Sequence, residues 1–415
     1  MSRQATKGIA IVGGGIAGLA AALNLHARGI DCTVYERAPE VLEIGVGITI
    51  LPHAMREFSA LGIQDEIVAA GIENLESCFF NRFGQKIYCE PRGLTAGYPV
   101  PEVGLHRGRL HTILYRKAVE ILGADRIVTD HDLIDLEQDE DGTTLHFRRT
   151  AGGQMAAPVR AALVLGCDGI NSSVRKQFYP DENVAFAGIN TWRGVTRMPP
   201  ILTGRTYMRV GSIRTGKMVI YPIANLGDGS GNQLINWVAE IERPGQTKND
   251  WNKTSSAEDV PDLFKAWHFN WLDVGRMIEQ AERIFEYPMV DRDPVDRWTF
   301  GRATLLGDAA HPMYPRGSNG AAQASIDART IADKLAELPP QEALKAYEAE
   351  RLPACNRVVE TNRSTPPDII NIRVEELVGD QPFDNLDDYI SQDELRALSD
   401  DYKSAANFSA ASFRA

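Results

Sequence analysis

Residues 8–37, "GIAIVGGGIAGLAAALNLHARGIDCTVYER", decide the fold of this chain. Residues 9–12 are a short apolar run typical of a buried β-strand, and residues 16–28 are rich in the helix-forming residues Ala and Leu. Gly29 follows as a helix stop, and residues 32–35 are again typical of a strand. The stretch therefore predicts a βαβ unit.

The turn between the first strand and the helix contains Gly13, Gly15 and Gly18, which form the pattern G-x-G-x-x-G. In such a turn the first glycine permits a tight bend, the second lets a pyrophosphate approach the backbone, and the third lets the helix pack on the strand. The helix N-terminus then offers free N–H groups to the anion. Glu36, at the end of the second strand, can accept hydrogen bonds from both ribose hydroxyls of an adenosine. The unit predicts a dinucleotide site and leaves open whether NAD or FAD binds.

Length and charge limit the other classes of function. A chain of 415 residues predicts one large domain or two interleaved domains. The 44 basic and 56 acidic residues give a net charge of −12 without a polybasic run, which argues against a nucleic-acid surface and favours a small neutral or aromatic ligand. Residues 8–27 carry no charge, but the glycines at 13–15 would interrupt a spanning helix, so no membrane segment is expected.

The cysteines predict a reduced protein. Their number is odd, they are scattered and no two form a CxxC pair, which is poor for a disulfide framework or a zinc site; they are Cys32, Cys78, Cys89, Cys167 and Cys355. We therefore expect a cytoplasmic protein without a metal ion.

Further patterns outline the rest of the chain. Helices are predicted over residues 52–61 and 109–122, and residues 133–147 predict a β-hairpin. Residues 163–178 repeat the strand–turn–helix plan, with a turn at Asp168-Gly169 and Ser172 as a helix cap. From residue 188 to about 241 the sequence alternates and is rich in aromatic residues, which predicts a separate antiparallel sheet.

A second glycine-rich turn, "LLGDAAHPMYPRGSNGAA", occupies residues 305–322 and precedes a predicted helix at 321–338. Because one Rossmann unit can bind NAD alone, a second strand–loop–helix junction favours the longer cofactor FAD. Asp308 is placed to accept a hydrogen bond from a polyol hydroxyl, and residues 315–320 would bring backbone N–H groups toward the flavin ring. His311 is interpreted as a loop residue to which the sequence assigns no partner or metal.

With these motifs in this order, the chain resembles the single-component FAD-dependent aromatic monooxygenases with the para-hydroxybenzoate hydroxylase fold. Two more patterns resemble the salicylate hydroxylase-like branch: "HRxxL" at His106, Arg107 and Leu110, and "YExxRxP" at Tyr347, Glu348, Arg351 and Pro353. Segments 191–196, 287–294 and 317–324 resemble members that act on phenazine pigments. The resemblance spans about residues 9–357.

The resemblance implies an α/β fold in which a Rossmann-like FAD-binding domain of the glutathione reductase type is interleaved with an antiparallel-sheet substrate domain. The expected FAD-binding domain comprises residues 1–75, 100–185 and 285–335, and the substrate-binding domain residues 76–99 and 186–284. Residues 336–415 are expected to form C-terminal helices and a tail.

The resemblance also implies a set of FAD-binding residues: Gly13, Gly15, Gly18, Glu36, Arg37, Arg107, Asp168, Gly169, Asp308, Gly317, Asn319 and Gly320. Asp168 and Gly169 would also contact NAD(P)H as it passes. The alternatives are an exposed helix-start arginine for Arg107 and a helix-capping turn for Asp168. Many relatives carry an asparagine where this chain has Ala322, so Asn319 or backbone N–H groups would have to replace it at the flavin ring.

In this family NAD(P)H reduces FAD, and O2 then forms a flavin C4a-hydroperoxide that hydroxylates an electron-rich aromatic or N-heteroaromatic ring. Catalytic candidates in this chain are Arg209, Tyr221 and Pro315, and substrate-binding candidates are Trp237 and Tyr314; for each, sheet core or surface is an equal alternative. A dehydrogenase or epoxidase on the same scaffold, or a non-catalytic flavin or substrate binder, also stays open. We expect a monomer or homodimer.

Overall fold

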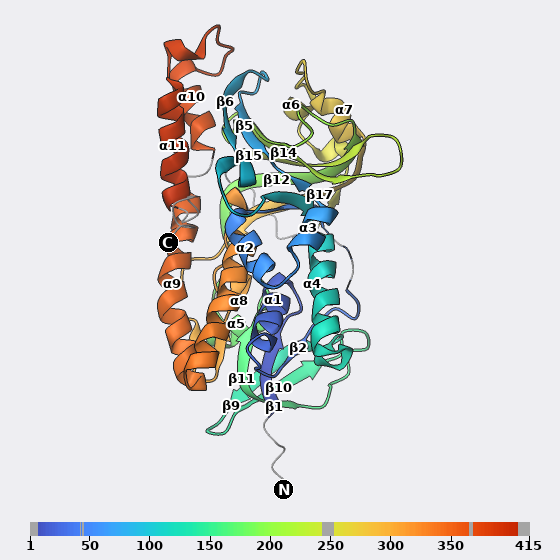
Figure 1. Cartoon of the computed structure of the whole chain (residues 1–415), viewed down its shortest axis with the longest axis vertical. Coiled ribbons are helices and arrows are strands. Elements are labelled where there is room, and N and C mark those ends of the chain that lie inside the picture. Colours follow the sequence, from blue (N-terminus) through green and yellow to red (C-terminus); the bar gives the residue numbers. More distant parts are fainter. Residues whose placement is uncertain (1–6, 42, 44, 243–252, 365–367, 406–415) are drawn as a thin grey trace.

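The computed structural model describes residues 7–41, 43, 45–242, 253–364 and 368–405 (Figure 1). The first six and the last ten residues, which the predicted domains include, lie outside the described residues. A mainly parallel sheet flanked by helices lies at one end of the molecule, and an antiparallel sheet lies at the other (Figure 1). The predicted α/β architecture with two interleaved units is confirmed.

The mainly parallel sheet brings the predicted motifs to one edge. Its central strands follow the order β18-β19-β11-β1-β2-β8, and β9 and β10 form the predicted hairpin beside β11. Val12 at the end of β1 pairs with Tyr35 of β2 and Gly166 of β11, and Gly166 pairs with Leu305 of β19. Because these four strands are parallel and in step, the loops that follow them leave the same edge of the sheet. The strands are β1 (Lys7–Val12), β2 (Cys32–Tyr35), β8 (Ile127–Val128), β9 (Asp132–Gln138), β10 (Thr143–Arg148), β11 (Val159–Gly166), β18 (Thr299–Phe300) and β19 (Ala303–Leu305).

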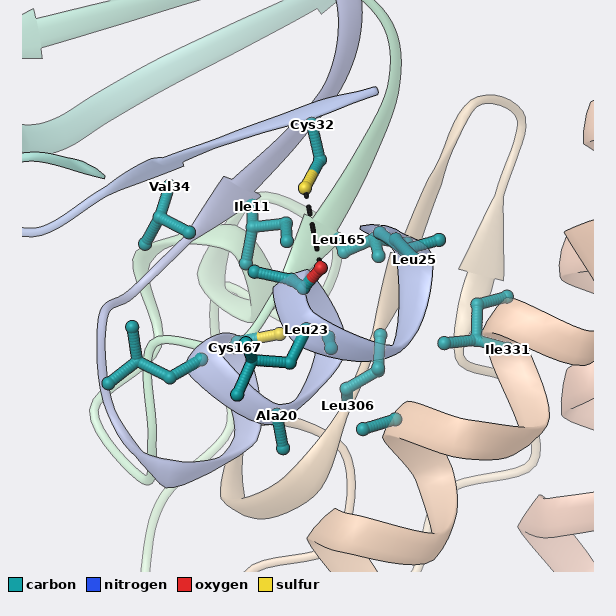
Figure 2. Close-up of a cluster of buried hydrophobic side chains, with 14 of the residues drawn as sticks. Ile11, Ala20, Leu23, Leu25, Cys32, Val34, Leu165, Cys167, Leu306 and Ile331 are labelled. Carbon is teal, nitrogen blue, oxygen red and sulfur yellow. Dashed lines mark hydrogen bonds between the residues drawn. The ribbon is translucent and has the colours of Figure 1, made fainter. Parts of the chain in front are cut away.

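Helices bury this sheet. Figure 2 shows the hydrophobic core where Ile11 of β1 and Leu165 of β11 meet Leu23 of α1, with Leu306, which follows β19, and Ile331 of α8 in the same cluster. The first helix, α1, packs against both α4 and α8, so segments about three hundred residues apart share one core. The helices around the sheet are α1 (Ile16–His26), α2 (Pro52–Ala60), α3 (Gln64–Ala70), α4 (Arg107–Leu122), α5 (Ser173–Phe178), α8 (Asn319–Glu337) and α9 (Pro340–Ser364).

The predicted antiparallel sheet is also confirmed, with the strand order β16-β17-β12-β15-β14-β13-β5-β6. Short helices α6 (Asp262–Lys265) and α7 (Val274–Glu279) cover one face. Its other face meets a small sheet of β3 (Gly47–Ile50), β4 (Ile72–Glu73) and β7 (Val103–His106), where the Gly47 N–H donates to Asn236 Oδ1 at 2.7 Å. The strands are β5 (Glu76–Phe80), β6 (Lys86–Pro91), β12 (Ala185–Met198), β13 (Thr206–Ser212), β14 (Gly216–Asn225), β15 (Gln233–Glu242), β16 (Lys253–Ser255) and β17 (Ala281–Asp291), so the predicted boundary at 285 falls within β17.

One expectation about the cysteines is wrong. Cys78 of β5 and Cys89 of β6 form a disulfide, whereas Cys32, Cys167 and Cys355 are free and buried. The two bonded residues lie directly opposite each other in the antiparallel register, with Cα atoms 4.1 Å apart. Only this pairing brings them together, because their spacing of 11 residues matches no cysteine motif.

The last two helices in the described part of the chain cover the end of the antiparallel sheet. Helices α10 (Ile369–Val378) and α11 (Gln392–Ala405) pack Ile370 and Leu395 against Phe79 of β5 and Tyr88 of β6. In Figure 1, α10 and α11 stand beside β5 and β6 on the same side of the molecule as α9. Within the described ranges no helix combines the length and apolarity needed to cross a membrane.

Candidate functional site

The turn after β1 has the geometry that a pyrophosphate needs. Gly13 has a φ of +103°, and a Cβ there would lie 2.5 Å from the carbonyl oxygen of Cys167. A Cβ on Gly18 would overlap the Gly13 carbonyl oxygen, so helix and turn pack closely only with glycine. Gly15 is the N-cap of α1, and no atom lies within 4 Å of the place its Cβ would take. The bare backbone at this helix N-terminus therefore faces open space, which suits an anion.

Glu36 follows β2 and supports this turn. Its Oε2 accepts the Gly14 N–H at 2.6 Å, and its Oε1 accepts the Ala38 N–H at 2.8 Å. The side chain is half-buried, whereas the neighbouring Arg37 is exposed. Because a carboxylate can accept about four hydrogen bonds, Glu36 retains lone pairs for the hydroxyls of a ribose.

Helix α4 contributes a contact that the sequence did not predict. His111 Nε2 donates to the Gly14 carbonyl oxygen at 2.6 Å, which fixes α4 to the glycine turn. His106 caps α4 by accepting the Gly108 N–H at 3.2 Å, and Arg107 is exposed at the first helical position. The side chain of Arg107 starts beside Gly45, and its backbone N–H donates to Val46 at 2.9 Å. The one sequence signal for His111 is its spacing. It lies four residues after Arg107, so both residues share one face of the helix.

The Asp168 loop lies next to the first turn but uses its carboxylate locally. Asp168 accepts hydrogen bonds from the Ser172 hydroxyl at 2.5 Å, the Ser173 N–H at 2.6 Å and the Val174 N–H at 3.1 Å. Burial raises the pKa of Asp168, and these donors oppose the rise. The carboxylate therefore stabilises the start of α5, as does the predicted cap Ser172. Half-buried Gly169, with a φ of +77°, completes the turn.

The loop after β19 presents Asp308 to solvent. Gly307, with a φ of +57°, lies so close to α1 that a Cβ there would be 3.0 Å from Ala17 Cβ. Asp308 is exposed between buried neighbours, and no side chain in the described part of the chain pairs with it. Its Oδ1 lies 3.8 Å from the place a Cβ on Gly320 would take. The two glycine-rich turns thus meet at α1, with a free carboxylate beside the second.

A buried polar network holds this loop from below. Asp327 of α8 accepts the Gly307 N–H at 3.1 Å, His311 Nε2 at 2.5 Å and Arg351 Nε at 2.8 Å. The expectation that His311 lacks a partner is wrong, because α8 brings Asp327 to it from 16 residues away. Burial opposes charge on Asp327, but His311 and Arg351 lower its pKa to about 2. The ligand atoms of His311, Asp327 and Cys355 lie close enough together to hold a metal ion. The Arg351 guanidinium, 3.2 Å from Cys355 Sγ, already places a positive charge at this cluster.

Residues 315–320 form the entry to α8. Pro315 is exposed, Gly317 has a φ of +70° and Ser318 a φ of +58°, so the backbone turns sharply before the helix begins at Asn319. Asn319 is buried and Gly320 is half-buried. This second helix N-terminus lies with Asp308 at one end of the site, and the open turn at Gly15 lies at the other. The arrangement fits a long cofactor that is bound at both ends, as FAD would be.

The antiparallel sheet places the predicted pocket residues on different faces. Arg209 and Tyr221 lie on the face toward the cofactor loops, where the Arg209 guanidinium stacks 4.6 Å from the Tyr207 ring and donates to Ser77 Oγ at 2.5 Å. Tyr207 and Tyr221 stack with ring centres 4.9 Å apart. Burial raises the pKa of Tyr221, so its hydroxyl stays protonated.

Two other predicted pocket residues lie elsewhere. Trp237 is fully buried on the opposite face, in the core beneath α6 and α7, and donates to Thr196 Oγ1 at 3.1 Å. Tyr314 packs on Ile189 and Met289 and hydrogen-bonds Asp291. The predicted substrate contact of Trp237 therefore gains no support from its position. Successive side chains of a strand face opposite sides of the sheet. Because Asn236 of β15 faces the small sheet, its neighbour Trp237 faces the other side.

Comparisons with known proteins agree with this geometry. The family model described as an FAD binding domain matches residues 6–362. The phenazine 1,6-dicarboxylic acid hydroxylase PhzS of Lysobacter antibioticus is 39% identical over 88% of this chain and 91% of its own length. The 3-amino-4-hydroxybenzoate 2-monooxygenase of Streptomyces cremeus is 33% identical over 86% of this chain and 85% of its own length.

Among solved structures, Klebsiella pneumoniae HpxO complexed with FAD and uric acid has a TM-score of 0.75 at 21% identity, covering 97% of each chain. A salicylate hydroxylase substrate complex has a TM-score of 0.72 at 19% identity, covering 99% of this chain and 97% of that one. These two likenesses establish the fold.

Proposed function

The chain belongs to the FAD-binding domain family, and on that premise we propose that it hydroxylates an electron-rich aromatic or N-heteroaromatic compound with NAD(P)H and O2. The observation that carries the proposal is the convergence of the loops after β1, β2, β11 and β19 at one sheet edge. On the antiparallel sheet, Tyr207 and Tyr221 pack with Val46, and Arg209 lines a cavity together with Gly317 of the loop before α8. Cofactor and aromatic substrate would then share one chamber.

The chain's own residues would divide the work. The turn at residues 13–18 would bind the pyrophosphate, and Glu36, with Arg37 and Arg107 nearby, would bind the adenosine half. Asp308 would hold the ribityl chain, and residues 317–320 would contact the ring of FAD. Bound FAD would supply the redox chemistry and the activation of O2. Asp168 and Gly169 border the first turn, where we propose that NAD(P)H passes.

Three side chains are proposed to act on the substrate. Arg209 is buried, and among the described residues its hydrogen-bond partner is Ser77 and not a carboxylate, which supports a role in holding a substrate carboxylate. Tyr221 would donate its proton in a hydrogen bond to a phenol oxygen or ring nitrogen. Pro315 is exposed beside the entry to α8. It would border the ring of the substrate and keep water away from that ring.

The substrate we propose to test first is a phenazine carboxylic acid. The identity to the Lysobacter phenazine hydroxylase supports this class. The segments TWRGVT (191–196), YPMVDRDP (287–294) and GSNGAAQA (317–324) also resemble 5-methylphenazine-1-carboxylate 1-monooxygenase. Salicylate-like, quinoline and pyridine acids are the next candidates.

The test measures NADH and NADPH oxidation by the FAD-loaded protein with a panel of aromatic acids and N-heteroarenes. We expect one class to stimulate the oxidation and to gain labelled oxygen from O2. Reduction of FAD by the substrate itself, without NAD(P)H and without label in the product, would instead identify a dehydrogenase. Label in an epoxide oxygen would identify an epoxidase. Substrate binding without flavin reduction would identify a non-catalytic binder. The cytoplasmic location and the monomeric or homodimeric state stay predictions.

A further inference from the structure

The C-terminal helix α11 lies beyond the residues that the family model matches, yet it reaches the cofactor loops. Ser399, Tyr402 and Lys403 stand at helical positions i, i+3 and i+4, so they share one face of α11. That face lines a cavity together with Phe79 and Arg209 of the antiparallel sheet and Gly317 of the loop before α8. The cavity thus joins three parts of the chain that are remote in sequence.

Tyr402 touches the cofactor loop directly. Its hydroxyl interacts with the side chain of Asn319, the first residue of α8: the place that a Cβ on Gly317 would take lies 2.0 Å from the hydroxyl and 3.2 Å from Asn319 Nδ2. A Cβ on Gly317 would overlap the same hydroxyl, so the loop approaches Tyr402 as closely as its glycine backbone allows. Tyr402 is buried, and burial raises its pKa to about 12 although Asn319 lowers it, so the hydroxyl stays protonated.

A polar clamp holds α11 in this position. Glu90 of β6 is buried and its Oε2 accepts the Ser399 hydroxyl at 2.6 Å and the Lys403 ammonium at 2.7 Å. Arg92 lies 3.5 Å from the other oxygen of Glu90. Because these contacts flank Tyr402 on the same helix face, they fix its hydroxyl against Asn319 and Gly317.

We propose that α11 completes the reaction site and that Tyr402 is a positioning residue: through Asn319 it holds the loop at residues 317–319 in the conformation that receives the flavin ring. The proposal rests on the proposed function, because that function assigns the ring to this loop. It also gives Asn319 a role, because the polar side chain of this loop is then set by a helix outside the residues that the family model matches.

The experiment compares Tyr402→Phe with Asp401→Asn, an exposed neighbour on the same helix, in the full chain. FAD binding is followed by flavin fluorescence and by the visible circular dichroism of the bound flavin. We expect Tyr402→Phe to weaken FAD binding by about 3- to 10-fold, the size of one lost hydrogen bond, and to change the dichroism, whereas Asp401→Asn changes neither. Unaltered affinity and dichroism in Tyr402→Phe would overturn the proposal.

Lys403→Met provides a second variant that leaves Tyr402 in place and loosens the clamp. We expect a smaller change in the same direction, and a thermal melt of each apoprotein checks that the fold is kept. With a turnover substrate, Tyr402→Phe should lower kcat more than it raises KM, because it disturbs the flavin side of the site. The flavin readouts need no substrate, so failure to find one would count against the proposed function while leaving this test intact.

Discussion

The N–H of Gly14 and Oε2 of Glu36 lie 2.6 Å apart, so the first glycine-rich turn and the end of β2 are joined directly. The same carboxylate would accept hydrogen bonds from the adenosine ribose, and therefore Glu36 both shapes the turn and binds the cofactor. We expect Glu36→Gln to weaken FAD binding by roughly 10- to 100-fold, because hydrogen bonds to a charged acceptor contribute about 1.5–3 kcal/mol. Titration of apoprotein with FAD measures this, and Glu40→Gln, which alters an exposed neighbour, should bind normally.

Asp308 should matter for the cofactor and not for the fold. The carboxylate is exposed and has no partner among the described residues, so Asp308→Ala removes no internal contact. We expect the melting temperature of the apoprotein to stay the same while FAD binding weakens by about tenfold or more, because the hydrogen bond to the ribityl chain is lost. A variant that melts earlier as apoprotein but binds FAD normally would contradict this role.

Asp327 should be essential for stability. Its carboxylate is buried and accepts hydrogen bonds from Gly307, His311 and Arg351. Asp327→Asn therefore leaves the cations His311 and Arg351 without their counter-charge. We expect a loss of about 3–5 kcal/mol in the free energy of unfolding, measured with urea. The matched control is Asp333→Asn, which removes a partly exposed partner of Arg28 and Arg329 on the same helix and should cost about 1 kcal/mol or less.

His53 should make the protein less stable in acid. Burial, with the positive charges of Arg56 and Arg351, lowers the pKa of His53 from 6.5 to about 3. Between these values the unfolded chain binds a proton that the folded protein does not, so stability falls as the pH drops below 6.5. The expected loss is about 1.4 kcal/mol one pH unit below that value.

The measurement for His53 is urea unfolding near neutral pH and about two pH units lower. His53→Gln should lose less stability over this interval than the wild-type protein. His26→Gln, which alters an exposed histidine, should behave as the wild type does. Equal acid sensitivity in all three proteins would show that His53 is not the group responsible.

Arg209 should decide which substrates bind. We expect Arg209→Met to raise the KM of a carboxylic acid substrate about 10- to 100-fold and to change the KM of its neutral amide little, because only the acid needs the buried cation. Arg214→Gln, an exposed arginine after the same strand, is the control and should leave both values unchanged. If acid and amide suffer equally, Arg209 does not bind the carboxylate.

Local sequence determined the parts of this protein that depend on neighbours along the chain. The glycines at 13, 15 and 18, the end of β2 at Glu36 and the cap at Ser172 all follow from turn and helix-end chemistry within a few residues. The alternation from 188 to 241 likewise predicted the antiparallel sheet, because side chains of a strand face opposite sides in turn.

Tertiary structure alone decided what distant segments do to one another. Trp237 and Tyr221 are both aromatic residues of one sheet. Because α6 and α7 pack on one face of that sheet, Trp237 lies in the core, whereas Tyr221 lies on the other face, which we assign to the substrate. The pairs His311 with Asp327, Cys78 with Cys89 and Tyr402 with Asn319 carry no spacing signal, since each depends on how strands and helices meet. Side-chain identity thus specified which bonds could form, and the packing of the elements selected those that do.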